Sequence, residues 1–402
     1  MTSNLTNPLQ MAFDDQDGVF HSAFDMVRAA IEDRAFPCAS IAVTHAGRLV
    51  LLKSFGKFVF EEDLENASPS SGSLREPGDV DRAVTASTLF DLASVTKAVA
   101  TTTMGMILYE RGLLELEAPI SGIVLEFLTG DARRREVTFR MLLAHSSGVP
   151  AYEKLFLKAH SREQLLRAAF QTPLTADPGT RAEYSDIGFI ILGIALERIA
   201  GESLDRFCQR EIFGPLGMSH TTFTPPAELR AKIPPTADER ELGYQGVANP
   251  AKPRSTFRNR LIQGEVQDEN AFVLGGVAGH AGLFSTAEDV ARFAHVMLSR
   301  GVPIVRPETL SLFTRRETTP AGTSRALGWD TPSAPSQSGK YFGPNSYGHL
   351  GYTGTSLWIA PDRGLSITLL TNRTWADCSN EAMKQVRPRI HDAIVEALAP
   401  NA

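Results

Sequence analysis

The two clearest pairs of strands in this 402-residue chain lie at its opposite ends. Residues 40–44 and 49–55 are apolar and rich in β-branched side chains, and a short Gly-containing turn between them predicts a hairpin. Residues 355–360 and 365–370 repeat this pattern near the C-terminus. The long stretch between the pairs has mainly helical patterns. We therefore predict an α/β (α+β) fold, with an antiparallel sheet flanked by helices, built from both chain ends, and an inserted, mostly helical lobe.

We expect one catalytic domain, because no linker rich in Pro, Gly or Ser divides the chain. Residues 1–17 are predicted to be an N-terminal extension and 18–398 a single domain. Its α/β lobe would comprise about 18–104 and 340–398, and its helical lobe about 105–339. A cleft between two such lobes is a natural place for a catalytic site.

Apolar residues at helical spacing predict the helices of both lobes. Polar stretches rich in Gly and Pro, at 61–86 and 225–270, predict long loops. The second loop could shape a substrate cleft. The predicted helices are about 18–34, 94–111, 138–145, 186–200, 204–212, 286–299 and 379–398.

Composition narrows the classes of function. A net charge of −6 without a dominant basic face argues against a nucleic-acid partner. The chain contains no run of 18 apolar residues, so we expect no membrane span, and no signal peptide is visible. We expect a cytoplasmic location, with a periplasmic or secreted one as the alternative if the N-terminus is a processed one. The three cysteines are widely spaced, which indicates reduced thiols. The histidines are scattered, so we expect no metal site, and we expect no cofactor.

The pattern Ser-x-x-Lys occurs twice, and only one copy lies where its geometry can work. A serine hydroxyl needs a nearby base to act as a nucleophile. Residues three apart share one face of a helix, so Lys97 can bring its amine to Ser94. The other copy, Ser54 and Lys57, begins in the predicted strand 49–55, and along a strand residues three apart point to opposite faces. The Ser94 copy is therefore the candidate catalytic pair.

A second candidate element is Tyr184-Ser185-Asp186, at the start of a strongly apolar helical pattern. No other Tyr in the chain has Asn or Asp two residues later. Two structural interpretations compete with a catalytic one. Asp186 could cap the helix by accepting from free backbone N–H groups. Tyr184 could be a core aromatic residue whose hydroxyl is satisfied locally.

The third element is His349-Leu350-Gly351, which leads into the last pair of strands. His-x-Gly also begins at His45 and His280, so the pattern alone carries little information. Context separates the copies, because glycines around His349 would let a substrate approach the backbone closely.

Together these elements resemble the class C β-lactamase and penicillin-binding-protein-like serine hydrolase superfamily. The resemblance covers nearly the whole chain, about 18–398. Two further runs, 268–271 and 275–282, resemble a β-lactamase-related esterase and peptidase subgroup. The resemblance rests on three motifs in their order and spacing: Ser94-x-x-Lys97, Tyr184-x-Asp186 and His349-x-Gly351.

The resemblance implies a role for each residue. Ser94 would be acylated by a small-molecule substrate, and Lys97 would take or relay its proton. Tyr184 would be a second general base and then the acid for the leaving group. Both bases would need lowered pKa values. The backbone N–H groups of Ser94 and Tyr352, next to Gly351, would form an oxyanion hole, in which one donor is typically worth about 3 kcal/mol.

Two departures from the family pattern bear on the substrate. His349 stands where many members have Lys, and a neutral His attracts a substrate carboxylate less strongly. Asp186 stands where β-lactamases usually have Asn, and an ionised Asp can only accept hydrogen bonds. Asp186 should also favour the Lys97 ammonium and shift base duty toward Tyr184.

These departures favour an esterase or peptidase that acts on an ester or small amide through an acyl-serine. The alternative is a true β-lactamase or D-Ala-D-Ala carboxypeptidase. A second alternative is a non-catalytic relative that senses ligands or self-associates. Oligomeric state stays open.

Four polar residues outside the motifs receive structural roles. His145 and His280 are expected to satisfy backbone groups in tight loops. Asp268 and Asn270 are expected to order the loop beside the cleft.

Overall fold

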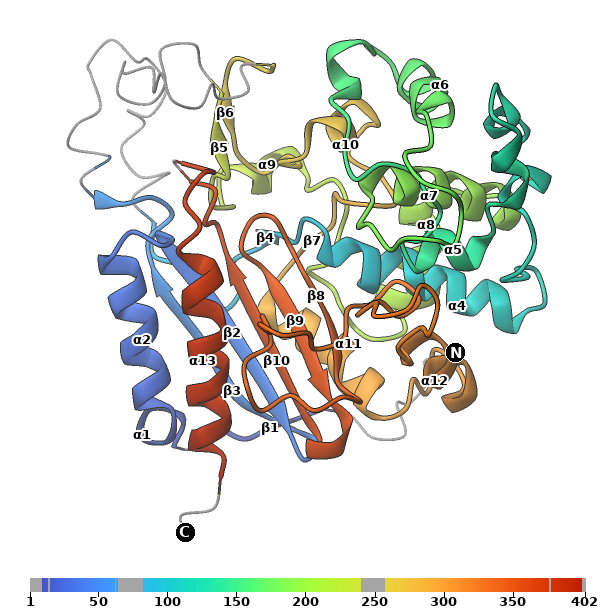
Figure 1. Ribbon diagram of the computed structural model, residues 1–402. Coiled ribbons are helices and arrows are strands. Elements are labelled where there is room, and N and C mark those ends of the chain that lie inside the picture. Colours follow the sequence, from blue (N-terminus) through green and yellow to red (C-terminus); the bar gives the residue numbers. More distant parts are fainter. Residues whose placement is uncertain are drawn as a thin grey trace.

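A six-stranded sheet forms the centre of the fold (Figure 1). The computed structural model describes residues 9–13, 15–61, 63, 82–239, 257–375 and 377–399. The strand order is β1-β3-β2-β10-β9-β8, and β10 pairs antiparallel with both β2 and β9. The two terminal hairpins therefore share one sheet, as predicted. The strands are β1 (Gln10–Met11), β2 (Cys38–His45), β3 (Arg48–Gly56), β8 (Tyr347–Leu350), β9 (Ser356–Ala360) and β10 (Leu365–Thr371).

One strand departs from the antiparallel prediction. β1 pairs parallel with β3, placing Gln10 opposite Arg48. It comes from the segment expected to be an extension, so part of residues 1–17 belongs to the sheet. Without β1, the edge of β3 would leave backbone N–H and C=O groups unpaired, and a short strand can pair with them in either direction.

Two helices cover one face of the sheet, α2 (His21–Glu32) and α13 (Met383–Ala397) (Figure 1). Val43 and Ile367 lie opposite each other on β2 and β10 and are completely buried. Both belong to the same apolar cluster as Phe24 of α2. Burying each such side chain stabilises the fold by about 1.5–3 kcal/mol.

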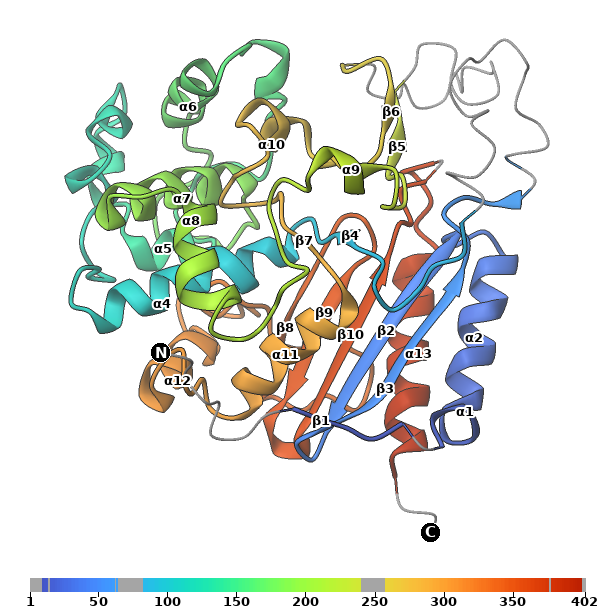
Figure 2. The ribbon, with the colours of Figure 1, turned by 180° about the vertical axis from the view of Figure 1, so that it is seen from behind.

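A single helix, α11 (Ala287–Leu298), packs on the opposite face, which is visible from behind (Figure 2). Side chains alternate along a strand, so Leu370 faces this second core together with Phe293 of α11. The sequence pattern predicts that this helix belongs to the helical lobe of residues 105–339. Its contacts with β2, β9 and β10 instead assign it to the sheet, because its apolar stripe covers this face. The other lobe boundaries stay a prediction.

The helix that follows Ser94 does not begin as a regular α-helix. Lys97–Thr102 is a π-helix, and α4 (Thr103–Glu110) continues it. The prediction of one uniform helix over 94–111 is therefore wrong in its first half. The wider turn leaves room for Thr103 Oγ1 to donate to the Ala98 carbonyl, five residues back, at 3.0 Å. π-Turns are frequent at functional sites.

The helical lobe is centred on α7 (Asp186–Ala200), whose bounds match the prediction. Residues 187–196 of α7 are buried on all sides, and Gly201 ends the helix in the left-handed conformation. Of the predicted loops, 62, 64–81 and 240–256 lie outside the described residues. The other elements are α1 (Gln16–Val19), α5 (Phe139–Leu143), α6 (Arg162–Gln171), α8 (Leu204–Cys208), α9 (Ala227–Arg230), α10 (Glu269–Val273), α12 (Pro307–Thr314), β4 (Phe90–Asp91), β5 (Ala237–Asp238), β6 (Leu261–Ile262) and β7 (Phe284–Ser285).

None of the helices in these described ranges has the length and apolar content that a bilayer crossing requires.

Candidate active site

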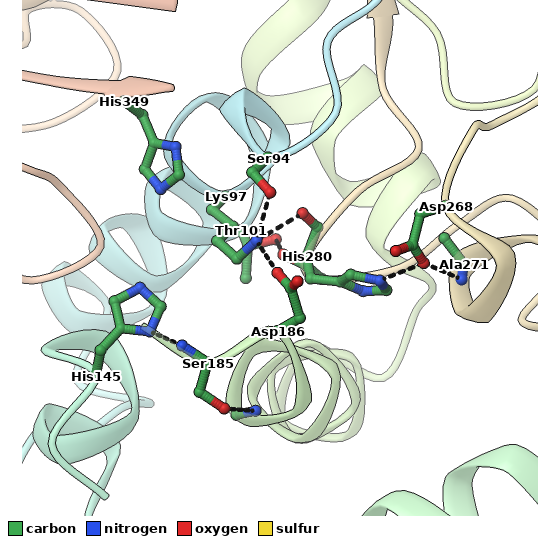
Figure 3. A network of polar contacts seen from close by, with 12 residues as sticks. Ser94, Lys97, Thr101, His145, Ser185, Asp186, Asp268, Ala271, His280 and His349 are labelled. Atoms are coloured by element: carbon green, nitrogen blue, oxygen red, sulfur yellow. Dashed lines mark hydrogen bonds and ion pairs between the residues drawn. The ribbon is translucent and has the colours of Figure 1, made fainter. Parts of the chain in front are cut away.

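Ser94 and Lys97 meet at the start of the helix, as the pattern predicts. Ser94 lies in the turn after β4 and is half-buried, while Lys97 is fully buried. Lys97 Nζ donates to Ser94 Oγ at 2.9 Å (Figure 3). Because Ser94 precedes a helix, the helix dipole favours negative charge at this point.

The Lys97 ammonium has three acceptors. Besides Ser94 Oγ, Nζ donates to Asp186 Oδ1 at 2.6 Å and to the His280 carbonyl at 2.9 Å. Burial lowers the pKa of Lys97 below its usual value, and the Asp186 carboxylate acts in the opposite direction. Asp186 thus favours the ammonium, as expected, but burial is the larger effect.

Asp186 is not the cap of α7. Ser185 occupies the cap position, and its Oγ accepts from the Gly188 amide at 2.9 Å. The same Oγ donates to the Pro150 carbonyl at 2.7 Å. The capping interpretation of Asp186 is therefore wrong, because the neighbouring serine already satisfies the helix end. The Asp186 carboxylate is left free to face Lys97.

Tyr184 lies in the middle of the polar cluster, with its ring against several of the cluster's members. Lys97 Nζ is 4.8 Å from the ring centre, and the His145 ring is 4.6 Å away. Burial and the Asp186 charge raise the pKa of Tyr184 well above 10, whereas a hydrogen bond with Ser94 acts to lower it. The expectation of a lowered pKa for Tyr184 is wrong, because desolvation of the phenolate outweighs that hydrogen bond.

His349 is buried and neutral. Its Nδ1–H donates to the Leu350 carbonyl at 2.8 Å, which leaves Nε2 as an acceptor. Burial and the nearby Lys97 lower the pKa of His349 to about 3. Within the described residues Nε2 has no hydrogen-bond partner. His349 therefore offers an acceptor, and no positive charge, to the site.

The turn after β8 carries the second predicted oxyanion donor and is tied to the nucleophile turn. Thr353 and Thr355 donate to the carbonyls of Asp91 and Leu92, at 2.7 and 2.8 Å. A Cβ on Gly351 would lie 2.5 Å from the Leu92 carbonyl, so only glycine permits this approach.

The two amides predicted for the oxyanion hole are both available. In the part of the chain that the structure describes, the amides of Ser94 and Tyr352 have no protein acceptor. Both are therefore free to donate to a substrate oxygen.

One cleft of about 1200 Å³ is lined by Ser94, Tyr184, Asp186, His349 and Tyr352, whereas Lys97 is fully buried. The sequence analysis missed Arg325, which also lines it. Its guanidinium lies 5.2 Å from the centre of the Tyr184 ring and pairs with Asp330. No local pattern marked this arginine, since it comes from an irregular segment after α12.

Of the histidines expected to satisfy backbone groups, only one does so with its ring. His145 Nδ1 accepts from the Ser185 amide at 2.9 Å. The His280 ring instead donates from Nε2 to Asp268 Oδ1 at 2.8 Å, so that expectation is wrong for His280. Asn270 holds a cleft-side loop, as expected: its Oδ1 accepts from the Phe156 amide at 3.0 Å.

In the described ranges no three His, Cys, Asp or Glu side chains gather closely enough to hold a metal ion. The chemistry that this cluster can support on its own is transfer of an acyl group to Ser94, with Lys97 and Tyr184 moving protons.

Known sequences match this chain over most of its length. A sequence profile of the family described as "Beta-lactamase" matches residues 23–383. A protein of Salmonella typhimurium, described as "Putative D-alanyl-D-alanine carboxypeptidase", is 30% identical over 417 aligned positions. That alignment covers 98% of this chain and 90% of the relative.

Solved structures share the fold at low sequence identity. EstCE1, described as a hydrolase with promiscuous acyltransferase activity, is 19% identical with a TM-score of 0.72, covering 94% of this chain and 99% of its own. Simvastatin synthase (LovD) from Aspergillus terreus is 20% identical, with a TM-score of 0.69 and coverage of 95% and 99%. A class C β-lactamase from Rhodobacter sphaeroides is 21% identical, with a TM-score of 0.66 and coverage of 94% and 100%.

Proposed function

This chain belongs to the β-lactamase family of serine hydrolases, and we propose that it cleaves an ester or small amide through a covalent acyl intermediate on Ser94. One observation carries the proposal. Lys97 Nζ lies 2.9 Å from Ser94 Oγ and 2.6 Å from Asp186 Oδ1, and both of these partners line one cleft together with Tyr184. A small-molecule substrate and the cytoplasmic location predicted from the sequence are part of this proposal.

Acylation begins with the neutral form of Lys97, which burial makes more accessible. Ser94 Oγ attacks the substrate carbonyl carbon and passes its proton to Lys97 Nζ. The amides of Ser94 and Tyr352 hold the carbonyl oxygen as it becomes negative. The bond to the leaving group then breaks.

Tyr184 gives its hydroxyl proton to the departing oxygen or nitrogen, and Lys97 returns a proton to Tyr184. This order differs from the one predicted from the sequence. The raised pKa of Tyr184 supports a neutral phenol that donates and not a tyrosinate that acts as the first base. Water attacks the acyl-serine in the second half, with the same proton transfers reversed.

Two features of the cleft favour an ester or small amide over a β-lactam. Neutral His349 supplies no charge for a substrate carboxylate, and Asp186 can accept but not donate. We expect Asp186→Asn to raise β-lactam acylation relative to ester turnover by about tenfold, on the scale of one charge-assisted hydrogen bond. An unchanged ratio, measured with nitrocefin and p-nitrophenyl acetate, would show that Asp186 does not disfavour β-lactams relative to esters.

A second candidate is a D-Ala-D-Ala carboxypeptidase or true β-lactamase. The 30% identity to the Salmonella protein favours it, and Arg325 supplies a positive charge beside Tyr184 that a carboxylate-bearing substrate can use. Turnover of nitrocefin or of a D-Ala-D-Ala peptide well above that of simple esters, lost in Ser94→Ala, would select this candidate.

Labelling of Ser94 tests the mechanism itself. Incubation with a fluorophosphonate followed by mass spectrometry should give one adduct on Ser94 and none in Ser94→Ala. A wild-type protein that stays unlabelled would instead support the non-catalytic alternative. Adding an alcohol to the ester assay distinguishes hydrolysis from acyl transfer, through the ratio of acid to new ester.

A further inference from the structure

One of the three acceptors of Lys97 is a backbone carbonyl. Lys97 donates to the His280 carbonyl at 2.9 Å, while the His280 ring points away from Ser94 (Figure 3). The ring is 1% exposed, and its Nε2 donates to Asp268 Oδ1 at 2.8 Å. The side chain of His280 therefore contacts Asp268, and its backbone contacts the catalytic lysine.

The residue before His280 is held by two neighbouring elements. A Cβ on Gly279 would lie 2.2 Å from the Phe189 carbonyl, so the backbone of residue 279 packs directly against α7. Thr101 Oγ1 donates to the Gly279 carbonyl at 2.7 Å. These contacts fix the position of residue 279, and the contact between the His280 ring and Asp268 adds a constraint on the direction of the next carbonyl.

Asp268 is itself held firmly. It caps α10, and the oxygen that receives the His280 ring also accepts from the Ala271 amide at 2.7 Å. The pKa of Asp268 lies below its usual range, because His280 and the Ala271 amide outweigh burial. An ionised carboxylate therefore stands at the end of the His280 ring.

Asp91 connects this carboxylate back to the nucleophile turn. Its Oδ2 accepts from the Gln267 amide at 2.7 Å, one residue before Asp268. Its Oδ1 accepts from the Ala93 amide at 2.8 Å, one residue before Ser94. Asp91 is 2% exposed, so these hydrogen bonds are shielded from water.

We propose that Asp91, Asp268 and His280 form a bracket that positions Lys97 against Ser94. The bracket runs from the Ser94 turn through Asp91 and residues 267–268 to the His280 ring, and returns through the His280 carbonyl to Lys97. The side chains of Asp91, Asp268 and His280 act as positioning groups, because within the described residues none of them hydrogen-bonds to Ser94 or Lys97, and of these three residues only His280 reaches Lys97 Nζ, through its carbonyl. The inference rests on the proposed acyl-serine function and identifies what orients the base of that site.

Asp268 has a second effect that makes the bracket measurable. Its negative charge raises the pKa of Lys97, so removing that charge should make Lys97 lose its proton at lower pH. Other groups that face Lys97 must stay unchanged for the comparison. They are Asp186, Tyr184, Arg325, His145 and His349.

The test is the rate of fluorophosphonate labelling of Ser94, and kcat/KM for an ester, measured against pH. Asp268→Ala and His280→Phe should slow labelling about 10- to 100-fold with little change in KM, because a small misplacement of a catalytic group costs this much. Asp268→Asn keeps an oxygen acceptor for both partners. It should recover most of the rate, with its acidic limb displaced to lower pH.

Asn270→Ala is the matched control. Asn270 is also buried at the start of α10, but it anchors residues 153–156 and is not part of the bracket. It should lower the unfolding temperature about as much as Asp268→Ala and leave the acidic limb in place.

The outcomes separate the two proposals. Wild-type labelling together with unchanged rates and an unmoved acidic limb in the Asp268 variants would overturn the bracket alone. Equal slowing in Asn270→Ala would also overturn it, because general loosening would then explain the effect. A wild-type protein that is not labelled would overturn the proposed function and the bracket with it.

Discussion

The chain carries Ser-x-x-Lys at two places that the fold treats differently. At the start of the π-helix, Lys97 Nζ lies 2.9 Å from Ser94 Oγ and is completely buried. In β3, the Ser54 hydroxyl lies 3.1 Å from that of Ser40, on the neighbouring strand. The two patterns differ in backbone geometry and burial, and only the first brings serine and lysine together.

The difference teaches that the motif is a distance requirement and not a sequence requirement. A helical turn supplies the distance, and burial then lowers the lysine pKa below its usual value. The second copy has neither a helical turn nor a fully buried lysine. Residues three apart on a strand face opposite ways, so a strand cannot supply the required distance. Paired substitutions at the two copies therefore test whether only the Ser94 copy is catalytic.

The largest effect is expected from the serines. Ser94→Ala should reduce kcat/KM by about 10⁴-fold or more, because no other group can carry the acyl intermediate. Ser54→Ala should leave kcat/KM within about twofold. Steady-state ester hydrolysis checks both, and comparable losses in the two variants would contradict the assignment of the nucleophile.

The lysines come next. Lys97→Met should lower kcat/KM by about 10²–10⁴-fold, since it removes the base and leaves Asp186 without its partner. Lys57→Met is the control, because Lys57 pairs with exposed Glu61 at 2.8 Å and such surface pairs contribute about 0–1 kcal/mol. If kcat/KM of Lys97→Met equals that of the wild type, another group must deprotonate Ser94.

Tyr184 distinguishes the reactive copy further. Tyr184→Phe should reduce ester turnover by about 100-fold, because the leaving group loses its proton donor. Since its pKa lies well above 10, the wild-type rate should show no alkaline decline from Tyr184 below about pH 10. The pH dependence of kcat/KM checks this. An alkaline limb near pH 8 that disappears in Tyr184→Phe would contradict the proton-donor role.

The smallest effect concerns stability at the cleft wall. The folded pKa of His349, about 3, lies below its unfolded value of about 6.5, so its stabilising contribution is present above pH 6.5 and is lost as the pH falls toward 3. Each pH unit in this window costs about 1.4 kcal/mol. His349→Gln should therefore reduce the stability lost between pH 7 and 5 by about 2 kcal/mol.

Urea unfolding at the two pH values measures this difference. His45→Gln, in another His-x-Gly pattern at the end of β2, serves as the control. An acid sensitivity that is the same in His349→Gln and wild type would show that other groups, such as buried His391, dominate it.

Much of the fold was predictable because local patterns and packing agree. Two hairpins, the bounds of α7 and the contact of Ser94 with Lys97 follow from periodicity and helix geometry. The π-helix did not follow, since a helical pattern in the sequence does not distinguish a π-turn from an α-turn. The place of α11 did not follow either, because an amphipathic helix carries no mark of which surface it will cover.

The site divides along the same line. Sequence patterns were enough to identify the side chains that we propose for acyl transfer, because Ser94, Lys97, Tyr184 and Asp186 lie in motifs whose spacing is local. Only the tertiary structure decided their charge states and their support. Burial sets the pKa directions of Lys97 and Tyr184, and Asp268 reaches Lys97 only through a chain of contacts that spans the fold. Desolvation and long-range hydrogen bonds depend on what the folded chain brings together, which no local pattern records.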